Sequence, residues 1–231
     1  MTDLKLTVVE IREETPLIRS VTLASGGAEP LPGYCAGAHL TFEIPDVGTR
    51  KYSLVNTSAE PGATAKPMTY IVSVRKEEFG GGGSLYIHGL AVGDVLVSQP
   101  PKNNFPLKPG SSPGAAVALV GGGIGVTPLI SMAAELKAKK RQFELVYAAR
   151  SNDDFAFRSE IEALAGSGGR FHADDVAGRV FDLPGYFASL GADTQVYACG
   201  PKPMLKACMA AARALGWPRD RLSYELFFSV A

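Results

Sequence analysis

A glycine-rich segment near the middle of the chain has the composition of a phosphate-binding turn. It reads Val117-Ala-Leu-Val-Gly-Gly-Gly-Ile-Gly-Val-Thr-Pro128, which predicts a short apolar strand, a turn and a helix start in that order. Glycines let the backbone approach a phosphate closely, and the free N–H groups and the dipole of a helix N-terminus attract the anion. The spacing matches neither GxxxxGK[ST] nor GxGxxG, so a tight turn without a ligand is the alternative.

Three further segments carry residue types that suit ligand binding. Arg50-Lys-Tyr-Ser-Leu54 offers an arginine for a phosphate, a tyrosine for a flat ring and a serine for a ring nitrogen; the alternative is a solvated edge strand. Gly80-Gly-Gly-Gly-Ser84 suits either a loop that wraps a phosphate or a flexible connection. Ala198-Cys-Gly-Pro-Lys-Pro-Met204 places a cysteine and a glycine turn at a strand end, where parallel sheets bind ligands.

The overall charge and hydropathy exclude several classes of protein. The chain has 231 residues, with 23 basic and 23 acidic side chains and therefore no formal net charge. Nucleic-acid binders usually carry a strong basic excess, so we do not expect one here. The longest wholly apolar run, residues 115–120, is too short to span a bilayer. The first residues lack the regions of a signal peptide, so we expect a cytoplasmic protein that does not bind membranes.

The cysteines and histidines show no ligand spacing. No CxxC or HxxxH pair occurs, so we expect neither a disulfide framework nor a metal site. The residues concerned are Cys35, Cys199, Cys208, His39, His88 and His172.

The first hundred residues have the pattern of strands. Runs rich in β-branched residues are separated by turn formers such as Pro32-Gly33 and Gly93-Asp94. Several short antiparallel strands at this spacing favour a barrel, because closure leaves no exposed edge. A short helix is expected over residues 84–90. The predicted strands are 4–12, 18–24, 39–44, 50–54, 68–76 and 95–99.

A Pro/Gly/Ser-rich stretch at residues 107–114 marks a change of pattern. Strands and helices then alternate, which is typical of a parallel sheet with covered faces. We therefore expect a β + α/β protein, with a six-stranded antiparallel β-barrel domain over residues 1–110 and a parallel α/β domain over 111–231. Thr127 is predicted to cap a helix that begins at Pro128. The predicted strands of this half are 116–120, 143–148, 195–198 and 222–228, with a further helix over 155–164.

The four motifs, in this order and at these distances, resemble the ferredoxin–NADP reductase superfamily. The strings Gly83-Ser84, Gly93-Asp94, Val97-Ser98 and Asn104-Phe-Pro-Leu107 are most similar to its phthalate dioxygenase reductase and vanillate demethylase reductase branch. The resemblance extends from the first strand to Phe227. It implies that the barrel binds a flavin and that the α/β domain binds a nicotinamide nucleotide.

The resemblance implies a set of flavin contacts in the barrel. Arg50 would bind the flavin phosphate, Tyr52 would lie against the ring system and Ser53 would lie near N5. This branch uses FMN, which we expect here, with FAD as the alternative. Gly81 stands where the branch often has an arginine, so one charge-assisted contact to the phosphate is missing. The implied contacts are Arg50, Tyr52, Ser53, Leu54, Gly82, Gly83 and Ser84.

The resemblance places the pyrophosphate of the nucleotide on residues 121–127, with Cys199 near the nicotinamide. Ser151 stands where relatives that use NADH often have an aspartate, and Arg150 suits a 2′-phosphate. We expect NADH, because close relatives mostly use it, with NADPH as the alternative. The implied contacts are Gly122, Gly123, Gly125, Thr127, Arg150, Ser151, Cys199, Gly200 and Pro201.

The last strand resembles the His-Phe-Glu-x-Phe segment of the same branch and reads Ser223-Tyr-Glu-Leu-Phe227. It implies that Glu225 and Phe227 lie beside the flavin, where they would join Ser53 and Cys199 as catalytic residues. The alternative is that Phe227 packs on the sheet. The cofactors carry out the hydride transfer, and the protein supplies orientation.

The implied function is a flavin-dependent reductase. It would pass a hydride from NADH to FMN and single electrons to an iron–sulfur acceptor, serving a Rieske-type oxygenase or demethylase. The alternatives are an electron-transfer subunit of a larger complex and a Rossmann-type dehydrogenase. Relatives continue into a [2Fe–2S] ferredoxin domain, and this sequence stops at Ser229-Val-Ala231. We expect no cluster in this chain, an acceptor in a removed domain or a separate protein, and a monomer.

Overall fold

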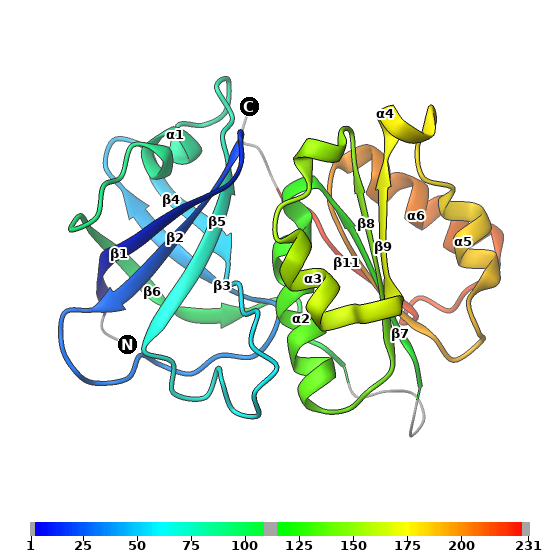
Figure 1. The fold of residues 1–231 in the computed structure, drawn as a ribbon, viewed down its shortest axis with the longest axis horizontal. Coiled ribbons are helices and arrows are strands. Elements are labelled where there is room, and N and C mark those ends of the chain that lie inside the picture. The colour runs from blue at the N-terminus through cyan, green and yellow to red at the C-terminus, as the bar shows by residue number, and fades with distance from the viewer. Residues whose placement is uncertain (1–2, 109–114, 228–231) are drawn as a thin grey trace.

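The computed structural model describes residues 3–108 and 115–227, which form two β-sheets that lie side by side (Figure 1). We call residues 3–108 the barrel and residues 115–227 the α/β part. The predicted domain boundary at residues 110 and 111 lies outside the described residues. No helix within the two described ranges is long and apolar enough to cross a membrane.

The first sheet is antiparallel, and its six strands follow the order β4-β3-β6-β1-β2-β5. An antiparallel bridge between Leu54 and Val72, and a hydrogen bond from Val55 N to Ile71 O (2.8 Å), connect β4 to β5 and close the sheet. The predicted six-stranded barrel is therefore confirmed. Its strands are β1 (Leu4–Thr15), β2 (Ile18–Ser25), β3 (Ala38–Ile44), β4 (Gly48–Ser53), β5 (Thr69–Arg75) and β6 (Val95–Asn103), and α1 (Gly83–His88) precedes β6.

Alternation along the strands builds the barrel core. Leu40, Phe42 and Ile44 are buried on β3, and they point inward with alternate residues of the neighbouring strands. Two strands are longer than predicted. β1 continues to Thr15, whose hydroxyl accepts hydrogen bonds from the backbone of the hairpin turn, and β6 continues to Asn103, which pairs with Ala38.

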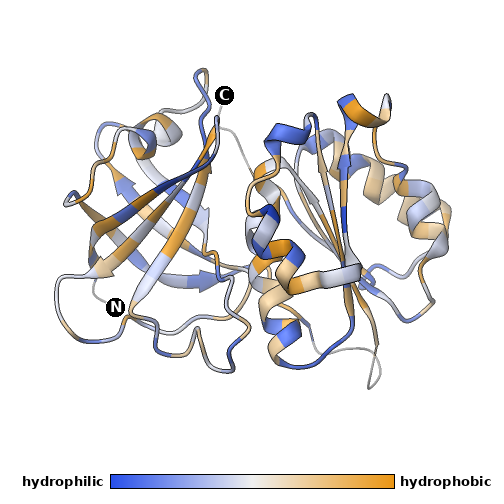
Figure 2. Ribbon diagram, viewed as in Figure 1, coloured by the Kyte–Doolittle hydropathy of each residue, from blue (hydrophilic) through white to orange (hydrophobic). Residues whose placement is uncertain are grey.

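The second sheet is parallel, in the order β11-β10-β7-β8-β9. Helices α2 and α3 cover one face and α5 and α6 the other (Figure 1), and apolar residues gather between each layer and the sheet (Figure 2). This confirms the parallel α/β prediction. The strands are β7 (Val117–Gly122), β8 (Phe143–Ala149), β9 (Gly169–Ala173), β10 (Gln195–Cys199) and β11 (Leu222–Glu225); the helices are α2 (Val126–Ala138), α3 (Arg158–Ala165), α4 (Asp174–Ala177), α5 (Leu183–Ser189) and α6 (Lys202–Ala214).

Three local predictions were wrong. Thr127 does not cap α2, because a 3₁₀ turn over Gly123–Gly125 runs directly into the helix and the Thr127 hydroxyl donates to Ile124 O (3.0 Å). Helix α3 begins at Arg158 rather than at residue 155, since Phe157 before it is left-handed (φ 58°). Strand β11 ends at Glu225, and residue 228, its predicted end, lies outside the described residues.

The barrel and the α/β part share one apolar contact. Ile18 and Val55 of the barrel belong to the same buried cluster as Val126 and Ile130 of α2. Ser131 adds a polar contact, because its hydroxyl donates to Leu54 O (2.7 Å) and accepts from Asn56 N (2.8 Å). A continuous apolar contact of this kind fixes the two parts relative to each other.

Candidate active site

Arg50 and the glycine loop that precedes α1 form the first part of the site. The Arg50 guanidinium donates to Thr49 O (2.9 Å) and to Gly81 O (2.6 Å). No salt bridge joins it to a carboxylate of the described residues. A guanidinium that donates to carbonyl groups and has no anionic partner keeps its charge available to a phosphate.

The glycines of this loop allow it to lie directly on Arg50 and Tyr52. A Cβ at Gly83 would lie 2.7 Å from Arg50 Cγ and 2.8 Å from Tyr52 Oη, and Gly82 is left-handed (φ 80°). The structure therefore brings Arg50, Tyr52, Gly82 and Gly83 together. Ser84 has another role, since its hydroxyl donates to Glu77 O (3.2 Å) and accepts from Glu77 N (3.0 Å), which closes the base of the loop.

Tyr52 and Ser53 point to opposite sides of β4. Burial raises the pKa of Tyr52 to about 12, so its phenol stays neutral at physiological pH. Ser53 is buried on the other side, directly opposite His39 of β3. The sequence pattern treated His39 as isolated. The strand register places His39 opposite Ser53. The Nε2 atom of His39 is buried without a hydrogen-bond partner among the described residues.

His39 is held in its neutral form. Burial lowers its pKa, and the ammonium groups of Lys51 and Lys102 lower it further. An unpaired buried ring nitrogen opposite Ser53 marks this strand pair as a place where a ligand meets polar groups of the barrel. Only the orphaned nitrogen, which a sequence does not reveal, distinguishes His39 from an ordinary core histidine.

The two glycine motifs of the α/β part interlock. A Cβ at Gly125 would lie 2.4 Å from Cys199 O, and one at Gly122 would lie 2.8 Å from Pro201 Cδ. A Cβ at Gly200 would lie 3.0 Å from Gly122 N. Strands β7 and β10 are neighbours in the sheet, so both turns follow their strands at the same edge. This edge, at the carboxyl ends of parallel strands, is where such sheets bind ligands.

The end of this edge carries a pair of buried ionisable groups. Cys199 on β10 is the register partner of Glu225 on β11. Burial raises the pKa of the Cys199 thiol, and the Glu225 carboxylate raises it further. Burial also raises the pKa of Glu225 to about 7, opposed by the ammonium of Lys51 on β4. Lys51 belongs to β4, the strand that also carries Tyr52 and Ser53. Phe227 lies two residues beyond, with 37% of its surface exposed.

Arg150 and Ser151 follow β8 at the same edge. Arg150 is exposed, and the Ser151 hydroxyl accepts from Asp153 N (3.3 Å). Beside them is a pocket of about 170 Å³ between the ends of β8 and β9 and the start of α3. It is lined by Asn152, Phe155, Arg158, Phe171, His172, Ala173, Val176 and Ala177.

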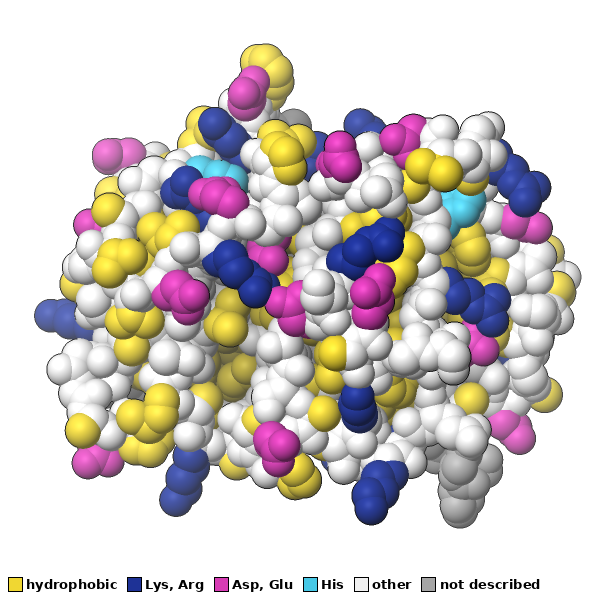
Figure 3. Space-filling model, in the orientation of Figure 1, with side chains coloured by type: hydrophobic (Ala, Val, Ile, Leu, Met, Phe, Trp, Pro, Cys, Tyr) yellow, Lys and Arg dark blue, Asp and Glu magenta, His cyan; other side chains and the backbone are white. Residues whose placement is uncertain are grey.

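The arrangement offers groups that suit anionic ligands at two places, one on the barrel and one at the edge of the parallel sheet. Arg50 offers a phosphate contact at the first, and the glycine turns offer a second anion site near the N-terminus of α2. Among the described residues no three His, Cys, Asp or Glu side chains come together to hold a metal ion. On the face shown in Figure 3, basic and acidic side chains are interspersed.

Known proteins resemble this chain over almost its whole length. The oxidoreductase NAD-binding domain family matches residues 119–210. The chain is 37% identical to the tetrachlorobenzoquinone reductase of Sphingobium chlorophenolicum, over 96% of this chain and 67% of that protein. It is 30% identical to the vanillate O-demethylase oxidoreductase of Acinetobacter baylyi, over 98% of this chain and 69% of that protein.

A solved structure agrees with these sequence matches. Phthalate dioxygenase reductase superposes with a TM-score of 0.87 at 30% identity, over 99% of this chain and 69% of that one. The chain thus spans about two thirds of the length of each of these relatives. The chain belongs to the ferredoxin–NADP reductase superfamily, as an NAD(P)H-dependent flavoprotein reductase related to the phthalate dioxygenase and vanillate demethylase reductases.

Proposed function

We propose that the protein passes a hydride from NADH to FMN and then delivers single electrons to an iron–sulfur acceptor that serves a Rieske-type oxygenase or demethylase. The observation that carries the proposal is the Arg50 guanidinium, which contacts the glycine loop, has no carboxylate partner among the described residues and can therefore bind the flavin phosphate. Phthalate dioxygenase reductase transfers electrons from pyridine nucleotides to a [2Fe–2S] centre, which supports an acceptor of this kind.

The residues of the barrel would bind and orient the flavin. Arg50 would pair with the phosphate, Tyr52 would lie against the ring system, and Ser53 and Leu54 would face the ring edge. FMN, when bound by these residues, would supply the chemistry of hydride acceptance and of single-electron release. The protein therefore needs no nucleophile, and the raised pKa of Cys199, which keeps its thiol protonated, fits that requirement.

The residues of the α/β part would hold the nucleotide. Gly122, Gly123 and Gly125 would bind the pyrophosphate at the start of α2, with Thr127 beside them. The turn Cys199–Pro201, together with Glu225 and Phe227, would enclose the nicotinamide and exclude water from it. Arg150 and Ser151 would meet the adenosine ribose.

The spectrum of the purified protein tests the proposal. Flavin absorption before NADH is added, and its bleaching under anaerobic conditions afterwards, are the expected results. Reduction of ferricyanide or cytochrome c by the isolated chain with NADH then separates a reductase from a passive electron-transfer subunit. Failure to bind flavin even on reconstitution would sink the proposal, and FAD in the released fraction would overturn the FMN assignment.

Kinetics with both nucleotides test the choice of NADH. We expect kcat/KM for NADH to exceed that for NADPH, and S151D to widen the difference, because a carboxylate repels a 2′-phosphate. A preference for NADPH in the parent protein would overturn the NADH assignment. The control is S167A, which changes an exposed serine of the 3₁₀ turn Gly166–Gly168, elsewhere in the α/β part.

A further inference from the structure

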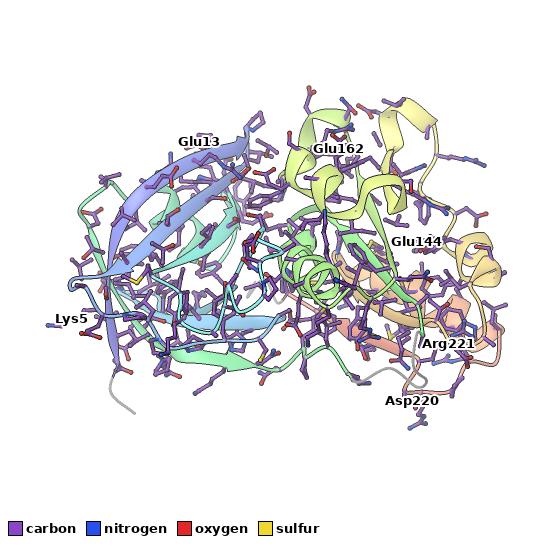
Figure 4. The ribbon with its side chains drawn as sticks, turned by 60° about the horizontal axis from the view of Figure 1, so that its bottom comes forward. Lys5, Glu13, Glu144, Glu162, Asp220 and Arg221 are labelled. Carbon is purple, nitrogen blue, oxygen red and sulfur yellow. The ribbon has the colours of Figure 1, made fainter. Side chains whose placement is uncertain are left out.

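Arg12 of the barrel contacts the start of α3 in the α/β part. Its Nη2 pairs with Glu160 Oε1 (2.8 Å), and its guanidinium carbon lies 5.4 Å from the centre of the Phe157 ring. Both contacts join strand β1 to a segment that follows it by more than a hundred residues. Figure 4 labels Glu13 of β1 and Glu162 of α3, which are close in sequence to Arg12 and Glu160.

The barrel holds Arg12 in a fixed orientation. Its Nε donates to Glu14 Oε1 (2.7 Å), and the Glu14 side chain is only 5% exposed. Ser20 of β2 donates to the same carboxylate (2.5 Å) and shares a hydrogen bond with Ser73 of β5 (2.7 Å). The carboxylate is thus tied to three strands. Because Glu14 is buried and hydrogen-bonded, it orients the Arg12 guanidinium, whose other edge and flat face point to α3. The contact with α3 therefore costs little additional side-chain entropy.

Phe157 has a strained backbone. It is left-handed (φ 58°, ψ 28°) although it has a bulky side chain, and it is 4% exposed. Non-glycine residues adopt this conformation only where the surroundings impose it. Burial against the barrel and the guanidinium of Arg12 supply that constraint here.

The strained residue directs its neighbours into the pocket at the ends of β8 and β9. Arg158, the next residue, lies over the rings of Phe155 (5.0 Å) and Phe171 (4.4 Å) and donates to Asn152 Oδ1 (3.2 Å). All four side chains line that pocket. The turn at residues 155–158 therefore forms part of the pocket wall on one side and contacts the barrel, through Phe157, on the other.

We propose that Arg12 is a positioning residue: by holding Phe157 and Glu160 it fixes the turn at residues 155–158, and with it the wall of the pocket that receives the adenosine end of the nucleotide. This inference rests on the proposed function, because it takes the ligand to be a nicotinamide nucleotide. It assigns part of nucleotide affinity to a residue of the flavin-binding barrel that touches neither cofactor.

Titration of the flavin-loaded protein with ADP-ribose tests the inference, because this fragment lacks the reacting ring. We expect R12M to raise the Kd for ADP-ribose and the KM for NADH together, by roughly three- to tenfold. The kcat and the flavin Kd should stay within twofold, and R12K should recover part of the affinity. The matched control is R19M, since Arg19 pairs with Glu13 and contacts only the barrel.

A second variant keeps the test independent of how well R12M folds. E160Q removes the ion pair from the α3 side, and we expect the same direction of change. The R12M/E160Q double variant should lose little more affinity than R12M, because the two residues act through one contact. A lower melting temperature with an unchanged Kd for ADP-ribose would overturn the inference. If the parent protein itself fails to bind ADP-ribose or to oxidise NADH, the proposed function fails instead.

Discussion

Cys199 and Glu225 are register partners on the parallel strands β10 and β11, and the Glu225 carboxylate adds to burial in raising the pKa of the Cys199 thiol. Cys199 is fully buried, and Glu225 Oε2 is buried without a hydrogen-bond partner among the described residues. A neutral thiol beside a carboxyl group that titrates near neutral pH forms a dry, weakly charged wall. Such a wall suits a hydride transfer, which moves no net proton to the protein.

The raised pKa of Glu225 predicts that its ionisation destabilises the folded protein. The folded pKa is about 7 against an ordinary value of 4.5, so the folded state holds more protons than the unfolded state in this range. The free energy of unfolding should therefore fall as the pH rises from about 4.5, and the loss should be complete above about 7. E225Q removes this loss and should be more stable than the parent at pH 8, by a few tenths to about 2 kcal/mol.

Urea unfolding of both proteins at pH 5 and pH 8 measures this difference. The advantage of E225Q should be larger at pH 8 than at pH 5. E29Q, which changes an exposed carboxylate of the barrel, is the control and should show the same stability as the parent at both values. An E225Q advantage that does not grow with pH would contradict the prediction.

The position of Arg50 on the glycine loop predicts that flavin affinity depends on the flavin phosphate. R50Q should raise the Kd for FMN about 10- to 100-fold, because a charge-assisted hydrogen bond is lost. The Kd for riboflavin, which lacks the phosphate, should change less than threefold. Flavin fluorescence on release measures both constants. R213Q removes an equal charge from an exposed site on α6 and serves as the control; an equal loss for riboflavin would show that Arg50 does not bind the phosphate.

Gly81 offers the reverse experiment. It is exposed, its carbonyl accepts from Arg50, and it is not among the left-handed glycines, so a larger side chain there does not require a left-handed backbone. G81R should restore a second cation beside the phosphate and tighten FMN binding by roughly three- to tenfold. Riboflavin affinity again separates a phosphate contact from a general effect on the loop. Unchanged FMN affinity would place the phosphate elsewhere.

The sequence predicted most strands because their alternation is a local property. It missed β9, whose residues Gly169–Ala173 include no β-branched side chain, and it missed α5, whose first turn contains Pro184 and Gly185. Both elements form because the parallel sheet pairs β9 with β8 and because α5 packs against α6. Tertiary contacts overrode weak local preferences there.

The motifs predicted which segments form the site, but they did not predict how those segments fit together. The position of His39 opposite Ser53 depends on the register between β3 and β4, and the contact of Arg12 with Phe157 depends on how two sheets pack. Neither leaves a periodic signal in the sequence. The left-handed backbone of Phe157 could not be predicted either, because aromatic residues rarely adopt this conformation and nothing in the local sequence indicates it.

Because Gly125 lies directly against Cys199, we predict that adding one methyl group at position 125 disrupts the packing of the turns that follow β7 and β10. An alanine Cβ at position 125 would lie 2.4 Å from the Cys199 carbonyl oxygen, so one of the two turns must move. G125A should lower the free energy of unfolding by about 1–3 kcal/mol and weaken ADP-ribose binding. G27A, where nothing lies within 4 Å, is the control. Equal melting temperatures of G125A and the parent would rule out the tight contact.

The Ser131 hydroxyl connects the barrel and the α/β part through two hydrogen bonds, and we predict that both contribute to stability. This hydroxyl is buried, donates to Leu54 O and accepts from Asn56 N, so S131A leaves two backbone groups of the barrel without partners. We expect a loss of about 1–3 kcal/mol in the free energy of unfolding. Because Leu54 follows Tyr52 and Ser53, which we propose to contact the flavin, we also expect FMN to dissociate faster.

Urea unfolding and stopped-flow release of FMN measure the two effects of S131A. S189A is the matched control, since Ser189 donates to Tyr186 O (2.7 Å) within its own helix and joins no two parts of the chain. It should cost less than about 1 kcal/mol and leave the release rate unchanged. If S131A and S189A cost the same, the Ser131 hydroxyl contributes no more than a local hydrogen bond, and other contacts between the two parts, such as the apolar cluster around Val55 and Ile130, outweigh it.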